Sequence, residues 1–202
     1  MKKGFTLLEL LIVIGILAIL SSVTVLVLNP AELLRQARDT QRINDLGAIN
    51  NALALYSGTA ATVALGTAGT RYTHAGITVD ASSTAAFGAS QCAGDTSTVS
   101  TSSDRTVLGA GWIPVDFGDI SGGTPLAVLP VDPSSGIGSA AKINSWPLVY
   151  WFEGSTASST WELAAKMESE RYKDGGTNDV STNDGGTCRY WYEIGTEPGL
   201  DF

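Results

Sequence analysis

The chain begins with a long apolar run that contains a single carboxylate. Glu9 stands four residues after Phe5, and residues 10–28 that follow it contain no charged side chain. A helix over residues 10–28 would be about 28 Å long at 1.5 Å per residue, which is close to the roughly 30 Å of a bilayer's hydrocarbon core. The pattern therefore predicts a helix over residues 5–29 that enters a membrane.

Beyond residue 28 the apolar positions become periodic. From Leu33 to Tyr56 they recur every three or four residues, which is the spacing of an amphipathic helix with one buried face. The two segments together predict a helical spine over residues 5–56, with its amphipathic part at 30–56. Pro30 argues against full continuity, because proline lacks a backbone donor and clashes one turn back. Pro30 can mark a simple kink or the start of a new helix, or it can lie at the end of a longer unwound stretch.

The strand signals are clearest near the C-terminus. Residues 147–152 (PLVYWF) and 160–168 (TWELAAKME) predict a hairpin, and residues 188–194 (CRYWYEI) predict a third strand. In the second segment Trp161 and Leu163 alternate with Glu162 and Lys166, as in a half-buried strand. A sheet of residues 147–202 packed on the helix predicts an α+β fold with a long N-terminal helical spine and a small antiparallel sheet.

Residues 57–146 are rich in Ala, Gly, Ser and Thr and predict a loop-rich region with short strands at most. Within it, the stretch 95–104 (DTSTVSTSSD) is expected to be a polar loop, with O-linked sugars as an alternative. The globular domain is thus expected to span residues 30–202, with its sheet in the last quarter.

The net charge and the cysteines of the chain limit its possible binding partners and its possible covalent bonds. The formal net charge is −8 although Lys2 and Lys3 precede the apolar run, and an acidic domain repels phosphate backbones, which argues against nucleic acid as a partner. Cys92 and Cys188 are the 2 cysteines, and they lack metal-site spacing. Outside the cytoplasm they can form a disulfide worth roughly 4 to 5 kcal/mol. Two buried free thiols are the alternative.

The N-terminal letters KKGFTLLELLIVIGILAIL resemble the class III signal of type IV pilins and of the pseudopilins of type II secretion. The shared features are a short basic leader, a Gly, then Phe, Thr, two apolar residues and Glu. The resemblance implies that residues 1–4 are a leader, that a prepilin peptidase cuts between Gly4 and Phe5, and that Phe5 is N-methylated. It also implies a precursor in the cytoplasmic membrane with its N-terminus inside. Inner-membrane assembly machinery would then build an extracellular homopolymer.

The spacing of Glu9 suggests what its charge does in such a polymer. Residues four apart share a helix face, so after cleavage the Phe5 ammonium and the Glu9 carboxylate stand one turn apart. A neighbouring subunit's ammonium can approach the same carboxylate and fix the axial register. The alternative is that Glu9 only snorkels to the membrane surface. In filaments of this family part of the spine is unwound, and the resemblance implies that Gly15 and Pro30 bracket that stretch.

Arginines recur on one face of the amphipathic helix, at Arg35, Arg38 and Arg42. They can pair locally with the acids Glu32, Asp39 and Asp45, or they can form salt bridges between subunits.

Residues 173–187 (KDGGTNDVSTNDGGT) are rich in side-chain oxygens that suit Ca²⁺. Gly/Asn/Asp loops are also ordinary turns, so a chain without a cofactor is the other expectation. The resemblance adds that major pseudopilins bind calcium in a C-terminal loop, and Asp132 and Pro133 are similar to their Asp-Pro segment. The candidate ligands are Asp174, Asn178, Asp179, Asn183 and Asp184.

No sequence pattern promotes catalysis. His74 is the 1 histidine, and residues 139–142 (SAAK) fit SxxK without its partner motifs. The sequence therefore predicts a non-enzymatic type IV pilus subunit. A major pseudopilin of a type II secretion system and a non-polymerising, single-span surface-binding protein are the alternatives.

Overall fold

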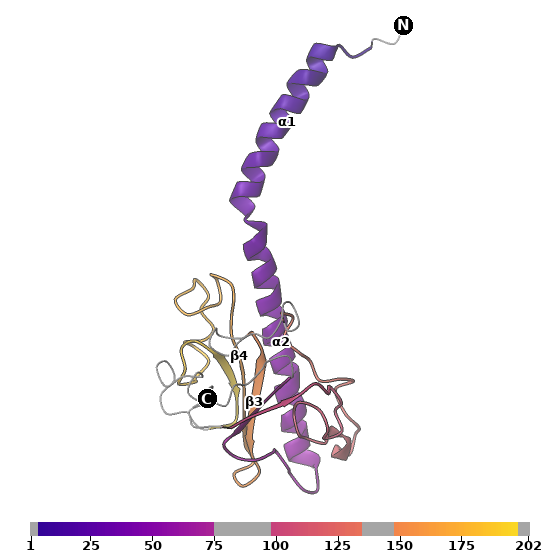
Figure 1. Ribbon diagram of the computed structural model, residues 1–202, viewed down its shortest axis with the longest axis vertical. Coiled ribbons are helices and arrows are strands. Elements are labelled where there is room, and N and C mark those ends of the chain that lie inside the picture. The colour runs from indigo at the N-terminus through magenta and orange to yellow at the C-terminus, as the bar shows by residue number, and fades with distance from the viewer. Residues whose placement is uncertain (1–3, 75–97, 135–147, 198–202) are drawn as a thin grey trace.

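The computed structural model describes residues 4–74, 98–134 and 148–197 of the chain, without the side chains of residues 25–28. A long helix, α1 (Leu7–Leu28), projects from a domain that is built on a second helix, α2 (Pro30–Thr59) (Figure 1). A sheet and loops cover one side of α2. The α+β class predicted from the sequence is confirmed.

The two helices are separated by one residue. Asn29 adopts a left-handed conformation (φ 38°, ψ 73°), and its carbonyl accepts hydrogen bonds from the N–H groups of Glu32 (3.0 Å) and Leu33 (3.3 Å). Pro30 is the first residue of α2, a position where its missing N–H has no helical partner to lose. Gly15 lies inside α1, so this subunit has no break there, and the unwound stretch predicted for a filament stays a prediction.

The sheet has five strands in the order β2-β1-β3-β4-β5. β1 and β2 pair in parallel, and the other pairs are antiparallel. The hairpin predicted from residues 147–168 is present as β3 and β4. The strands are β1 (Thr70–His74), β2 (Thr98–Ser102), β3 (Tyr150–Ser155), β4 (Thr160–Ala165) and β5 (Tyr192–Gly195), and a 3₁₀ turn, η2 (Phe117–Asp119), precedes β3.

Two short strands lie in the region that was expected to be rich in loops. β1 lies inside the sheet between β2 and β3, and β2, inside the stretch expected to be a polar loop, forms its edge. Both are rich in Thr, whose branched Cβ suits a pleated strand even where the side chains are polar. At the other edge β5 begins later than predicted, because residues 188–191 form a turn in which the Trp191 N–H donates to the Cys188 carbonyl (3.0 Å).

The main core lies between α2 and one face of the sheet. Trp161 spans this interface, and its Nε1 donates to the Asn50 Oδ1 at 2.8 Å. The segment around η2 closes the core on the remaining side, where the Tyr56 and Phe117 rings meet edge to face at 6.1 Å. The helix and sheet residues in this core include Leu46, Ile49, Leu53, Tyr56, Tyr150, Phe152 and Leu163.

The opposite face of the sheet is also covered, so the expectation of a half-buried β4 was wrong. Ala164 is fully buried and Glu162 is 4% exposed. Ala164 belongs to a second apolar cluster with Trp151, Cys188 and Trp191. The turn before β5 folds onto this face and removes it from solvent, which the alternation of residue types within β4 could not reveal.

Candidate assembly site and its attachment to the domain

The N-terminal end of α1 is closed by a reciprocal pair of side chains. Thr6 is the N-cap, and its Oγ1 accepts from the Glu9 N–H at 3.2 Å. In return the Glu9 Oε2 accepts from the Thr6 N–H (2.9 Å) and from the Thr6 hydroxyl (2.8 Å). This is a capping box, which the order Thr-x-x-Glu signals in the sequence. It fixes the carboxylate over the positive end of the helix, where a negative charge is favoured.

The predicted processing site lies just outside this cap. Gly4 and Phe5 precede Thr6 and are not helical, and the Phe5 side chain is 83% exposed. A cut between Gly4 and Phe5 would place a new ammonium directly beside the residue whose amide and hydroxyl already bind Glu9. The geometry therefore allows a carboxylate that is partly satisfied within its own chain to accept a further cationic donor.

The surface of α1 is apolar on all sides and is not covered. From Leu7 to Thr24 the mean hydropathy is 2.5 and none of the helix is buried. In the described part of the chain it is the one helix of a length and composition that suit a membrane span. Such a surface requires lipid or other apolar helices around it, because exposed apolar area of this extent is unfavourable in water.

The first half of α2 is attached to the domain by a buried group of charges. We call Arg38, Asp39, Arg42, Asp132, Ser134 and Glu168 the Arg42 cluster. The Arg42 guanidinium is fully buried and binds Asp132 through Nε (2.6 Å) and Nη2 (2.9 Å). Its Nη1 donates to the Asp39 Oδ1 at 2.7 Å, and its Nη2 also donates to Ser134 (3.0 Å) and Glu168.

The segment after β4 completes the attachment. Arg38 binds the Glu168 carboxylate with Nε at 2.9 Å and Nη2 at 2.6 Å. The Asp39 carboxylate accepts from the N–H groups of Glu168 (3.0 Å) and Ser169 (2.8 Å). Burial alone would raise the pKa of Glu168, but the hydrogen bonds from the two arginines lower it to about 2.

The three arginines of this helix face were expected to pair either with nearby acids or between subunits. Local pairs account for only part of the observed contacts. Asp39 is a local partner of Arg42, whereas Asp132 and Glu168 are distant in sequence. Arg35 has a weak local contact, with its Nη1 3.7 Å from the Glu32 Oε2. Asp45 lies farther along and accepts from the Tyr150 hydroxyl at 2.8 Å. Arg38 and Arg42 are therefore engaged within the subunit.

The candidate calcium ligands point to separate partners. Asp174 holds Arg189 at 2.8 and 2.9 Å. Asp179 accepts from the N–H groups of Gly175 (2.8 Å) and Ser181 (3.0 Å), and the Asn183 Nδ2 donates to the Asp179 carbonyl (2.9 Å).

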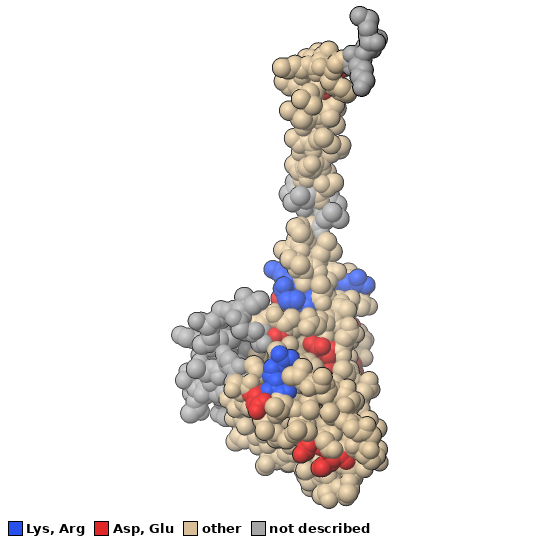
Figure 2. All heavy atoms as spheres, turned by 90° about the vertical axis from the view of Figure 1, so that its right-hand side faces the viewer, with Lys and Arg blue, Asp and Glu red and all other residues tan. Residues whose placement is uncertain are grey.

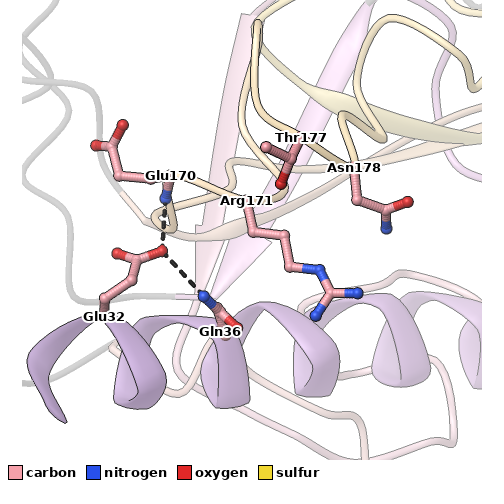
Figure 3. A pocket seen from close by; sticks show the side chains of 6 residues that line it. All are labelled: Glu32, Gln36, Glu170, Arg171, Thr177 and Asn178. Atoms are coloured by element: carbon pink, nitrogen blue, oxygen red, sulfur yellow. Dashed lines mark hydrogen bonds between the residues drawn. The ribbon is translucent and has the colours of Figure 1, made fainter. Parts of the chain in front are cut away.

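Asp179, Asn183 and Asp184 line one hollow beside β5, although the two carboxylates are bound to different groups of the chain. Asp184 accepts from the N–H groups of Gly186 (2.9 Å) and Glu193 (2.7 Å). Asn178 lines a polar hollow between α2 and the segment after β4 (Figure 3). Among the described residues, no three or more His, Cys, Asp or Glu side chains converge as a metal site. Asp132, in the Asp-Pro segment, is bound to Arg42.

Other sequence-based candidates fall outside the described residues. Cys92 is one of them, so its predicted disulfide with the fully buried Cys188 stays a prediction. The SxxK-like stretch 139–142 is another.

Residues 1–25 match the family model described as the prokaryotic N-terminal methylation motif. The chain carries a class III signal of the pilin type. Neither the curated proteins nor the solved structures compared with it gave a match. With the apolar α1, this signal supports a pilin- or pseudopilin-like protein that is anchored in the membrane as a precursor, and it is consistent with processing by a prepilin peptidase.

Proposed function

We propose that this protein is a structural subunit of an extracellular type IV pilus. A prepilin peptidase removes residues 1–4, Phe5 is methylated, and inner-membrane assembly machinery polymerises the subunit through α1. The observation that carries the proposal is the combination of the methylation motif with a helix that is apolar on all sides, uncovered, and closed at its tip by the Thr6–Glu9 capping box.

The capping box makes burial of Glu9 in a filament core less unfavourable. A buried carboxylate without partners is strongly disfavoured, whereas one that already accepts two charge-assisted hydrogen bonds needs fewer new partners. The Thr6 amide and hydroxyl supply those two bonds. The ammonium of a processed Phe5, from the same or a neighbouring subunit, would supply the balancing charge and so select one axial position.

Mass spectrometry of filaments sheared from native cells tests the processing step. We expect a chain that begins at Phe5 and carries one methyl group. Gly4→Val should leave the leader attached and abolish filaments, because its side chain would fill the peptidase's cleavage position. Gly58→Ala is the matched control, since an added Cβ there meets nothing within 4 Å. Filaments of normal yield that still contain residues 1–4 would refute the proposal.

Substitution of Glu9 separates charge from capping. Glu9→Gln keeps an acceptor oxygen for the Thr6 hydroxyl but removes the negative charge. We expect a membrane-inserted and processed subunit that assembles poorly, as measured by pilin in sheared fractions against total pilin. An unchanged sheared fraction would show that the charge has no part in assembly.

The same signal serves the major pseudopilin of a type II secretion system. Deletion of the gene distinguishes the two roles. Loss of surface filaments with normal export of secreted enzymes supports the pilus, and the reverse result supports the pseudopilus.

A further inference from the structure

The apolar surface of the protein does not end where α1 ends. Beyond the break at Asn29, Leu33 is 51% exposed and Leu34 is 62% exposed, on the first turns of α2. Ala31 and Ala37 beside them are exposed as well. An apolar arc of α2 thus continues the uncovered surface of α1 for about two turns, although α2 is already attached to the domain at this level.

The charges on these turns are segregated. The Glu32 side chain is only 15% exposed. Its Oε1 accepts from the Glu170 N–H at 2.8 Å and from the Gln36 Nε2 at 3.3 Å, so the domain binds this acid (Figure 3). The Arg35 side chain is 47% exposed, and its nearest carboxylate contact is the long one to Glu32. The uncovered part of these turns therefore presents two leucines and a cation.

The neighbouring segment of the domain adds no excess of negative charge. The exposed Glu170 carboxylate pairs with the Lys173 Nζ at 2.7 Å. Arg171 contacts the Tyr172 ring at 5.2 Å and forms no ion pair with any described residue. Figure 2 shows basic side chains at the junction between the apolar helix and the domain. Of the acids beside the two leucines, Glu32 is mostly buried and bound by the domain, and Glu170 is paired with Lys173.

The length of α1 places these turns at a definite depth. Its 22 residues extend about 33 Å at 1.5 Å per residue, which matches a hydrocarbon core of roughly 30 Å. Leu33 and Leu34 then lie about 8 to 9 Å beyond the end of α1, at the level of the lipid headgroups. Arginine side chains of this kind extend their charged end toward phosphate while their stem covers apolar surface.

We propose that Leu33, Leu34 and Arg35 form a membrane-interface surface that binds the anionic phospholipid headgroups of the outward-facing leaflet. The two leucines enter the boundary between headgroups and acyl chains, and the Arg35 guanidinium binds phosphate. This surface holds the domain at a fixed height above the bilayer before assembly. The inference rests on membrane anchoring of the precursor and not on filament formation, so the two can fail separately.

The depth of Leu34 can be measured directly. The full-length precursor is reconstituted in phosphatidylcholine vesicles with or without phosphatidylglycerol, without assembly proteins. An environment-sensitive fluorophore is attached to Leu34→Cys or Gln41→Cys under non-reducing conditions, and the unsubstituted chain is the labelling blank. Gln41 is exposed on the same helix, about two turns farther from α1. Lipids with a nitroxide in the headgroup should quench the fluorophore at residue 34 and not at residue 41.

The role of Arg35 is tested in the same preparation. An arginine near an anionic surface is worth about 1 kcal/mol, so Arg35→Gln should lower the ratio of quenched to unquenched fluorophore about fivefold in phosphatidylglycerol vesicles. Arg35→Lys keeps the charge and should preserve quenching. A residue 34 as unquenched as residue 41, or no difference between Gln and Lys at position 35, would overturn the proposal. If a fluorophore at residue 34 is unquenched in the vesicles but becomes shielded from solvent in filaments sheared from cells, the proposal is overturned and this surface belongs to a contact with a second copy.

Discussion

Replacing Arg42 by methionine tests how strongly the Arg42 cluster stabilises the domain. Arg42, Asp39 and Asp132 are 0%, 0% and 2% exposed, so the variant leaves two buried carboxylates without their cation. Removing one partner of a buried ion pair typically lowers the free energy of unfolding by about 3 to 5 kcal/mol. Since domains are stable by only about 5 to 15 kcal/mol, Arg42→Met should remove a large share of the total.

Arg189 provides the matched control. It also makes a two-nitrogen contact with one carboxylate, Asp174, but its side chain is 61% exposed. Exposed pairs contribute about 0 to 1 kcal/mol, so Arg189→Met should change stability little. Urea unfolding of the full chain in detergent can be followed by fluorescence, because Trp161 lies at the interface between α2 and the sheet.

A second substitution distinguishes the effect of lost packing from the effect of burying a carboxylate that has no cationic partner. Arg42→Met with Asp132→Leu should be less destabilised than Arg42→Met alone, because the double variant no longer buries one of the unpaired acids. Equal unfolding midpoints for Arg42→Met and Arg189→Met would refute a stabilising role for the Arg42 cluster. A double variant as unstable as the sum of its two single variants would show that Arg42 and Asp132 do not act as a pair.

Three further predictions concern the domain. Because the pKa of Glu168 is lowered to about 2 from 4.5, its contribution to stability is present above about pH 4.5 and is lost as pH falls toward 2. Glu168→Gln should therefore reduce the fall of the urea unfolding midpoint between pH 4.5 and pH 2. An unchanged fall of the midpoint would contradict this. Gly154→Ala places a Cβ 2.3 Å from a backbone carbonyl and should destabilise by about 1 to 3 kcal/mol, whereas Gly122→Ala meets nothing and should be neutral; equal midpoints would contradict the close approach. If Cys92 and Cys188 are paired, Ellman titration of the unfolded, unreduced chain should find no thiol, and reduction should lower stability by roughly 4 to 5 kcal/mol; two titrating thiols would contradict the pairing.

The sequence predicted the structure best where the apolar residues followed a single regular spacing. The apolar run and the three-and-four spacing after it predicted α1 and α2, and Pro30 marked the boundary between them. The hairpin of β3 and β4 followed from alternation and aromatic content. β1 and β2 were not located as strands, because their residues (TRYTH and TVSTS) are mostly polar and show no alternation of apolar and polar types that would distinguish them from a polar loop. β1 is placed by pairing with β3, and β2 by pairing with β1, which are contacts between segments far apart in sequence.

The order Thr-x-x-Glu at the tip of α1 indicates a capping box, which the spacing between Phe5 and Glu9 does not predict. Thr6, three residues before Glu9, is the partner in this chain. The two are compatible, since the carboxylate can accept from Thr6 and still face a processed terminus. The resemblance to pilins predicted a contact that Glu9 makes in the polymer, whereas the Thr-x-x-Glu pattern predicts a contact that Glu9 makes within its own helix.

The arginine stripe shows most clearly why charge patterns along a helix do not specify their partners. Spacing predicts which charges share a face, and it correctly placed Arg38 and Arg42 together. It could not predict that Asp132 and Glu168, from two separate segments, would converge on them, because that depends on how the sheet packs against α2. Once the core is formed, Arg42 is fully buried while the Arg38 side chain stays 32% exposed, and both are neutralised by acids of the same subunit. Arg35, nearer to α1 on the same helix, contacts neither of those acids, and its one carboxylate contact among the described residues is the long one to Glu32.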